Sequence, residues 1–63
     1  NRNILIKDIP QYSICLNRNG FLFLSGFYKE DIPKIKEVCL TANLCLKDEI
    51  YENKWVALKF KKK

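Results

Sequence analysis

The sequence predicts a small α/β domain that forms one end of a wider β-sheet. A run of large apolar residues at 21–24 is bounded by turn residues, which is typical of a strand covered on both faces. Apolar residues recur at helical spacing before and after that run, in residues 1–16 and 27–43. The last third of the chain predicts two further strands, 44–51 and 55–60.

Residues 21–25 are the strand around which the prediction is organised. Phe21, Leu22, Phe23 and Leu24 follow one another without the polar alternation of a half-exposed strand. A turn cluster at 17–20 precedes them, and Gly26 ends the run. Such a strand needs a neighbour on each edge and a layer on each face, which is more than 63 residues readily supply.

Composition narrows the classes of function. The chain has no histidine and three cysteines, in no spacing typical of a zinc site, so no metal site is expected. Each cysteine lies inside an apolar pattern, which favours free, buried thiols in a reducing compartment and hence a cytoplasmic protein. A redox or nucleophilic role would need a partnering base, which the pattern does not show.

The net charge of +5 could indicate a protein that binds nucleic acid. Much of the excess crowds the end of the chain, at Lys59, Lys61, Lys62 and Lys63. A solvated tail is the first interpretation of this run, and a phosphate-binding patch is the second. The sequence shows no signal peptide, and no apolar run is long enough to cross a bilayer, so no membrane partner is expected.

Residues 1–16 have helical periodicity, with Leu5, Ile9 and Leu16 on one face. Pro10 interrupts this segment, because proline lacks an N–H and clashes with the preceding turn. Either the helix kinks at Pro10, or a new helix restarts with Asp8 as its N-cap. We favour one element that is broken or kinked near Asp8.

The second helix is expected within residues 27–43, its body over 30–43. Ile32, Ile35 and Cys39 form its apolar stripe. Glu30 and Asp31 lie in its first turn, where the helix dipole favours negative charge, and the first turn also tolerates Pro33. Asn43 is a plausible left-handed residue at its end.

Three rules then fix the topology. Strand 21–25, the helix and strand 44–51 form a βαβ unit, so the two strands should be parallel with a right-handed crossover. Strand 55–60 returns as a hairpin, and because it is more apolar than 44–51 we place it between the other two. The predicted strand order is therefore first, third, second. One edge of 21–25 stays open, which predicts a missing strand before Asn1 and a first helix that leads from it.

Particular residues connect this arrangement to a family. They are the segment Gly-Phe-Leu-Phe-Leu-Ser-Gly at 20–26, the acidic helix start at 30–31, and Trp-Val-Ala-Leu at 55–58. In this order and spacing they resemble the C-terminal end of a Rossmann-like methyltransferase, specifically the bacterial PrmA family, which modifies large-subunit ribosomal protein eleven. The resemblance extends from about Ile4 to Phe60 and implies that residues 1–63 are a single partial domain.

The resemblance implies an S-adenosylmethionine-dependent N-methyltransferase that acts on amino groups of a ribosomal protein. The family's glycine-rich cofactor loop, acidic ribose-binding residue and substrate-docking domain are absent here, so no catalytic residue is assigned. The piece alone is expected to be inactive and to bind no cofactor. Its expected partners are the rest of the catalytic domain and the ribosomal protein. The family's Asn motif should lie just upstream of Asn1, which is kept as a candidate cofactor-binding residue.

Methyl transfer to an amine needs positioning and no covalent nucleophile, so the lack of histidine is no objection. Ligands of open α/β sheets bind at the carboxyl ends of the strands. Phe27 and Tyr28 follow the carboxyl end of strand 21–25, and we expect them to form a substrate-side wall in the intact enzyme. The alternative is that both simply pack over the helix start.

Two other classes of function stay open. A small basic α/β module could bind RNA through its lysines and aromatic residues, with Trp55 stacked on a base. Nucleic acid is nevertheless an unlikely partner, because Trp55 is expected to anchor the hairpin against helix 30–43. A protein-interaction domain could instead pair the open edge of strand 21–25 with a partner strand.

Overall fold

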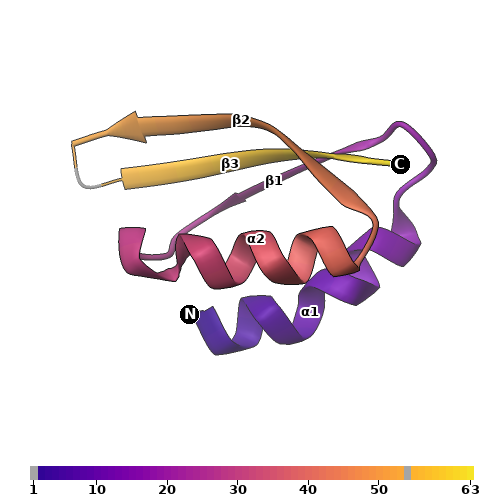
Figure 1. Ribbon diagram of the computed structural model, residues 1–63, viewed down its shortest axis with the longest axis horizontal. Helices are drawn as coiled ribbons and strands as arrows, with labels where there is room; N and C mark the ends of the chain where they lie inside the picture. Colours follow the sequence, from indigo (N-terminus) through magenta and orange to yellow (C-terminus); the bar gives the residue numbers. More distant parts are fainter. Residues whose placement is uncertain (1, 54) are drawn as a thin grey trace.

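The computed structural model describes residues 2–53 and 55–63, which form a layer of helices packed on a β-sheet (Figure 1). The predicted mixed α/β fold is confirmed. In chain order, the described elements are α1 (Arg2–Cys15), β1 (Phe21–Ser25), the short 3₁₀ helix η1 (Lys29–Asp31), α2 (Ile32–Thr41), β2 (Leu44–Glu52) and β3 (Trp55–Lys62).

The sheet has the strand order β1-β3-β2, as predicted. Both β1 and β2 pair antiparallel with β3, so they are parallel to each other and separated by it. Leu24 lies opposite Leu58 in the first pair, and Leu46 lies opposite Phe60 in the second. A register shift between Leu46 and Asp48 marks a bulge in β2. The βαβ unit predicted from the sequence is therefore present, with the hairpin strand inserted in its middle.

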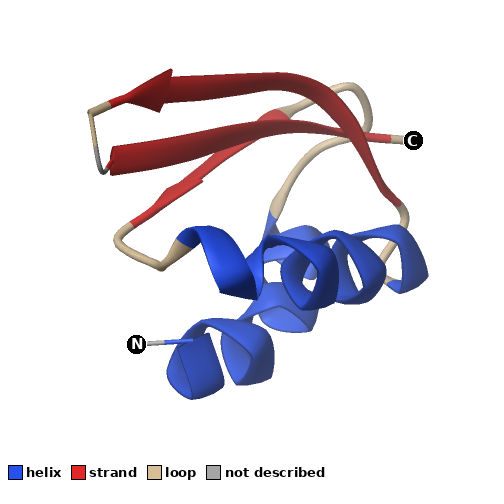
Figure 2. Ribbon diagram, turned by 60° about the vertical axis from the view of Figure 1, so that its left-hand side comes forward, coloured by secondary structure: helices blue, strands red, loops and turns tan. Residues whose placement is uncertain are grey.

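Both helices cover the same face of the sheet (Figure 2). The core lies between the two layers and contains residues that are almost completely buried: Ile9 from α1, Ile35 and Cys39 from α2, and Leu44, Leu58 and Phe60 from the sheet. Alternate residues of β3 point into this core, which is the period-2 pattern of a strand with one covered face.

Only one face of β1 is covered by the described chain. Leu24 is buried beneath the helices, whereas Phe21 and Phe23 are 47% and 63% exposed on the opposite face. The expectation of a strand covered on both faces is therefore not met within these residues. The physical reason is that both helices lie on one side of the sheet. The apolar side chains of β1 that point to the other side therefore face solvent.

Helix α1 runs from Arg2 to Cys15 with Pro10 inside it, so both the favoured break near Asp8 and the restart with Asp8 as N-cap are wrong. Tertiary contacts hold the helix on both sides of the proline. Ile9 is completely buried, and the Ser13 hydroxyl donates a 2.6 Å hydrogen bond to the carbonyl oxygen of Ala42 at the end of α2. These contacts offset the lost helical hydrogen bond.

Helix α2 begins later than predicted, at Ile32, because residues 29–31 form the tighter η1 turn. Its predicted end is confirmed. Asn43 follows the helix with a φ of 64°, in the left-handed region that asparagine tolerates, and Leu44 then starts β2. Asn53 has a similar φ of 55° at the end of β2, where the chain turns into the hairpin.

The C-terminal lysines are not a solvated tail, because β3 continues to Lys62. The backbone of Lys62 pairs with the loop before β1, accepting from the Asn19 N–H at 3.0 Å and donating to the Gly20 carbonyl at 2.8 Å. Its ammonium donates to the carbonyl oxygens of Ser13 at 2.5 Å and Leu16 at 2.9 Å. A cation is favoured there, because the C-terminal end of a helix carries unpaired carbonyl groups.

Trp55 lies on the face of β3 that points away from the helices and is 50% exposed. The prediction that it anchors the hairpin against the second helix is therefore wrong. Its neighbour Val56 takes that place and is buried. Register explains the error, because successive residues of a strand point to opposite faces.

The three cysteines differ in exposure. Cys39 is buried, as expected, while Cys45 is partly buried and Cys15 is exposed. No helix within residues 2–53 and 55–63 has both the length and the apolar character to cross a membrane. The same residues contain no cluster of three His, Cys, Asp or Glu side chains suited to a metal ion.

Candidate functional site

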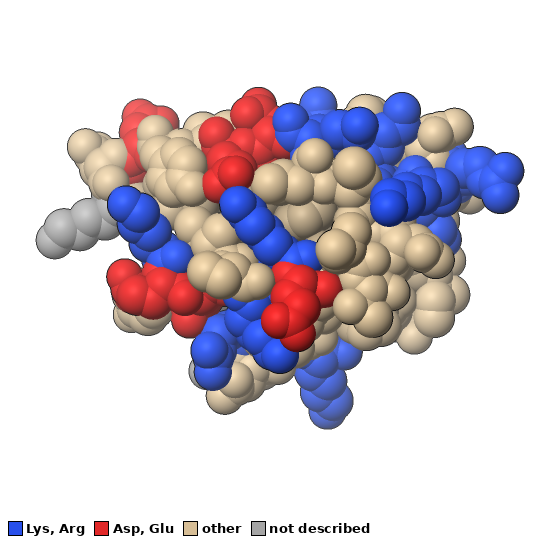
Figure 3. Space-filling model, viewed as in Figure 1, with Lys and Arg blue, Asp and Glu red and all other residues tan. Residues whose placement is uncertain are grey.

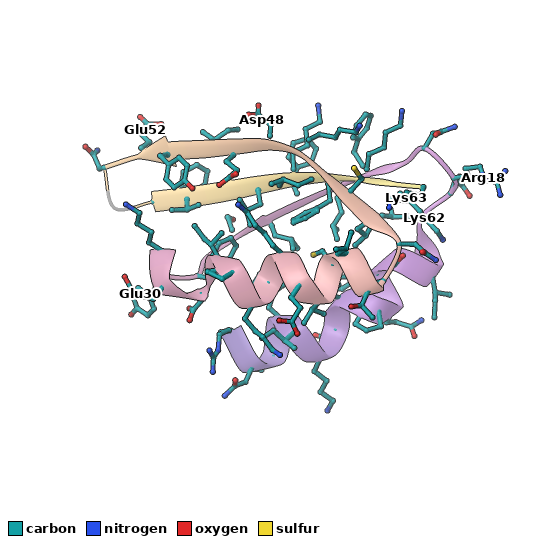
Figure 4. All side chains as sticks on the ribbon, viewed as in Figure 1. Arg18, Glu30, Asp48, Glu52, Lys62 and Lys63 are labelled. Atoms are coloured by element: carbon teal, nitrogen blue, oxygen red, sulfur yellow. The ribbon has the colours of Figure 1, made fainter. Side chains whose placement is uncertain are left out.

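A surface hollow of about 490 Å³ lies where the parallel strands β1 and β2 end. Residues from two parts of the chain line it: Tyr28, Lys29 and Glu30 after β1, and Tyr51, Asn53 and Val56 around the β2–β3 hairpin. This is the position at which open α/β sheets bind ligands. Figure 4 labels two residues at this end of the molecule, Glu30 beside the start of the helical layer and Glu52 beside the end of β2.

Tyr28 belongs to this hollow and is 76% exposed. A reciprocal pair of hydrogen bonds fixes its backbone. The Tyr28 N–H donates to Asp31 Oδ2 at 3.2 Å, and the Asp31 N–H donates to the Tyr28 carbonyl at 2.9 Å. The turn that starts η1 thus presents the Tyr28 side chain to solvent at the mouth of the hollow.

Phe27 has a different environment. It is only 8% exposed and belongs to the same core cluster as Leu24 and Ile32. The structure therefore brings Tyr28, and not Phe27, to the surface of the hollow. The role of both residues as a substrate-side wall stays a prediction.

Sequence reasoning missed Tyr51, which lines the hollow from the opposite side. Its hydroxyl donates a 2.6 Å hydrogen bond to Glu49 Oε1, and Lys36 Nζ donates to Glu49 Oε2 at 2.9 Å. The Tyr51 hydrogen bond, followed by the Lys36 contact, lowers the pKa of Glu49, and the same carboxylate raises the pKa of Tyr51. The available signal was the spacing of two along β2, which puts residues 49 and 51 on one face.

Asn1, the candidate cofactor-binding residue, lies outside the described residues. The described glycines do not form a cofactor cradle either. A Cβ at Gly20 would lie 2.9 Å from the carbonyl oxygen of Asn17, so its small size serves the turn before β1. Gly26, with a φ of 81°, has no atom within 4 Å of such a Cβ, so nothing is held close against it. That no S-adenosylmethionine binds to this chain alone stays a prediction.

Curated proteins similar to this chain share one name. Proteins called ribosomal protein L11 methyltransferase from Phocaeicola vulgatus, Bacteroides fragilis and Porphyromonas gingivalis are 40%, 42% and 45% identical to it over 60 residues. The predicted resemblance to this family is confirmed. These matches cover 95% of the present chain and 21% of each methyltransferase, so the chain spans about a fifth of the length of these relatives. No family model matches the chain.

The similarity to the ribosomal protein L11 methyltransferases includes nearly all of the described fold. It therefore includes the hollow lined by Tyr28 and Tyr51 and the half-covered sheet. About four-fifths of each methyltransferase has no counterpart in these 63 residues.

Proposed function

We propose that this chain is the C-terminal part of the catalytic domain of an S-adenosylmethionine-dependent N-methyltransferase that modifies amino groups of a ribosomal protein. The identity of 40–45% to named ribosomal protein L11 methyltransferases over 95% of the chain carries this proposal. The cofactor binds to residues outside this chain, and the chain alone is inactive. An enzyme with such a substrate works in the cytoplasm, among ribosomal proteins.

The open edge of β1 supports this proposal. β1 lies at one end of the sheet and pairs only with β3 among the described strands. An edge strand this apolar is an aggregation hazard unless another strand covers it. A preceding strand of a Rossmann-like sheet would occupy this edge, and α1 would be the crossover from that strand into β1.

The hollow supports a substrate-side role for Tyr28 within the same proposal. It lies at the carboxyl ends of β1 and β2, and two tyrosine rings with an apolar body and a polar tip line it. The hydrogen bond to Glu49 holds the Tyr51 side chain. Tyr28, which has a fixed backbone and an exposed side chain, is suited to contact an incoming polypeptide.

A segment exchange tests the proposed activity. The matched residues of this chain replace their counterparts in the Porphyromonas gingivalis methyltransferase, which is 45% identical in this stretch. We expect the chimera to bind S-adenosylmethionine in calorimetry and to add methyl groups to ribosomal protein L11, as measured by mass spectrometry. The isolated chain and the relative without the segment are the controls, and both should be inactive. A folded chimera that transfers no methyl group would contradict the proposal.

Tyr28→Ala in the active chimera tests the substrate-side wall. We expect kcat/KM for ribosomal protein L11 to fall about tenfold, which corresponds to about 1.4 kcal/mol of lost binding to the transition state. Binding of S-adenosylmethionine should not change. The matched control is Tyr12→Ala, a partly exposed tyrosine on α1. Equal kinetics for Tyr28→Ala and the parent chimera would remove Tyr28 from the site.

A further inference from the structure

The face of the sheet opposite the helices, here called the outer face, has its own chemistry. It is made of residues from all three strands: Phe21, Phe23 and Ser25 of β1, Trp55, Ala57, Lys59 and Lys61 of β3, and Cys45, Asp48, Ile50 and Glu52 of β2. We propose that an amphipathic helix from the part of the intact methyltransferase outside this chain covers the outer face and presents carboxylates to Lys59 and Lys61. This proposal rests on the proposed function, which supplies that part.

The outer face exposes large apolar side chains from every strand. Phe23 is 63% exposed, Trp55 50%, Phe21 47% and Ile50 42%. Scattered apolar residues are normal on a protein surface, but a contiguous group across neighbouring strands marks a surface that something covers. Both described strand pairs are antiparallel, but in the wider Rossmann-like sheet of the proposed function helices would cover both faces.

Two lysines of the outer face indicate which charge the covering layer should carry. Lys59 Nζ lies 4.4 Å from the centre of the Phe21 ring and 5.7 Å from that of Phe23, and Lys61 Nζ lies 6.0 Å from the Phe21 ring. Within residues 2–53 and 55–63, neither ammonium forms an ion pair. Asp48, which lies opposite Lys59, accepts a hydrogen bond from the Glu49 N–H instead, at 2.9 Å.

This arrangement requires acidic groups in the covering layer. Both ammonium groups lie over the Phe21 ring and therefore sit on an apolar patch. When another layer removes water, an unpaired ammonium is strongly destabilising, whereas an ammonium paired with a carboxylate is tolerated. Figure 3 shows that basic groups also gather at the end of the molecule that carries the C-terminus, which adds to the positive field there.

The length of the relatives leaves enough chain to supply the covering helix. The chain matches 21% of each methyltransferase, so about four-fifths of such a protein lies outside it. A second copy of the chain is the rival occupant, since Asp48 and Glu52 could face Lys59 and Lys61 of another molecule. The remainder of the methyltransferase is favoured because it also supplies the strand that the open β1 edge needs.

Hydroxyl-radical footprinting of the segment-exchanged methyltransferase tests whether the outer face is covered. Oxidation of Phe23 and Trp55, normalised to their rates in the unfolded chimera, should be several-fold slower in the folded chimera than expected for half-exposed side chains. Tyr28, which is 76% exposed, should keep a high rate as the internal reference. Rapid oxidation of Phe23 and Trp55 would overturn the proposal.

Charge reversal tests the carboxylates. Lys59→Glu and Lys61→Glu should each lower Tm of the chimera by about 3 °C or more, while Lys59→Met, which keeps the stem, should have a smaller effect. Lys7→Glu on exposed α1 is the matched control and should leave Tm unchanged. Equal Tm values for the Lys59→Glu and Lys7→Glu chimeras would overturn the acidic covering layer.

The outcomes separate this proposal from the proposed function. A chimera that methylates ribosomal protein L11 while Phe23 and Trp55 oxidise rapidly would contradict the covering helix and support the proposed activity. Protection of both residues without methyl transfer would contradict the proposed activity and support a covered outer face. Dimerisation of the chimera through the outer face, or salt-sensitive binding of single-stranded RNA that protects Trp55, would also overturn the covering helix.

Discussion

At the scale of single residues, Lys62 connects the last strand to the end of the first helix. Its ammonium donates to two carbonyl oxygens at the end of α1, that of Leu16 and that of Ser13, and the Ser13 oxygen also accepts the Leu16 N–H at 3.2 Å. Its backbone pairs with the loop before β1 (Figure 4). One side chain therefore links the last strand to the end of the first helix.

Lys62→Met tests this connection. The substitution keeps the aliphatic stem but removes a charged donor from two partly buried carbonyl groups, of which that of Ser13 keeps the Leu16 N–H, so we expect the free energy of unfolding to fall by about 1.5–3 kcal/mol. Urea denaturation followed by circular dichroism measures the change. Lys63→Met is the matched control, because Lys63 is exposed and its backbone N–H, which bonds to Asn43, is retained. Equal losses in the two variants would show that the Lys62 side chain contributes nothing specific.

The buried thiol of Cys39 gives a second prediction. Burial raises its pKa from 9.0 to about 12. Below pH 9.0 the folded and unfolded chains both hold the proton, and the stabilisation that this raised pKa provides is fully present. Between pH 9.0 and about 12 only the unfolded chain releases the proton, so this contribution is progressively lost as the pH rises.

The measurement is alkylation by iodoacetamide at pH 9.0, followed by mass spectrometry. The exposed Cys15 should react rapidly, and Cys39 only after unfolding in urea, because the thiolate is the reactive form. Cys15 is the control within the same molecule. Similar rates at the two positions in the folded chain would contradict the burial of Cys39.

The errors at this scale have a common cause. The sequence predicted that residues 55–60 form a strand, but it did not indicate which alternate residues face the helices. Val56, Leu58 and Phe60 do, so Trp55 points outward. Tyr51 was overlooked for the same reason, because its part in the hollow depends on the register of β2 against β3.

At the scale of elements, the turn after α2 sets where β2 begins. Asn43 has a φ of 64°, and its carbonyl accepts the Lys63 N–H at 3.0 Å, so the helix end and the chain end meet there. Left-handed geometry is unfavourable for residues with a Cβ unless, like asparagine, they can form local hydrogen bonds.

Exchanging Asn43 measures this strain. Asn43→Ala should lower the free energy of unfolding by about 1 kcal/mol, and Asn43→Gly should leave it unchanged or raise it slightly. Urea midpoints of the two variants give the comparison. Asn17→Ala is the control, because Asn17 does not have a positive φ. Destabilisation of the glycine variant as large as that of the alanine variant would assign the effect to lost side-chain contacts instead.

Element order and strand order were predictable because they depend on local apolar spacing and on which strand carries charge. The unbroken α1 was not. Proline normally interrupts a helix, and the tertiary contacts of Ile9 and Ser13 reverse that preference here.

The surface hollow was predictable only in part. The position of Tyr28 followed from its place after β1, but the burial of Phe27 depended on packing beneath η1.

At the scale of the whole molecule, the described residues leave the sheet uncovered at one edge and on one face. β1 has an open edge, and the outer face has no layer on it among the described residues (Figure 2). β1 is apolar on both of its faces, and the chain matches only 21% of the length of its relatives, which accounts for both features. They are expected of one end of a larger sheet.

Amide hydrogen exchange at β1 tests this central claim most directly. In the isolated chain, the backbone N–H groups of residues 21–25 that do not face β3 should exchange rapidly with deuterium, because edge strands leave alternate groups unpaired. In the segment-exchanged methyltransferase, all amides of this strand should exchange slowly. Equally rapid exchange of the outward amides in a folded, soluble chimera would show that no strand joins β1, and would contradict the account of this chain as one end of a methyltransferase sheet.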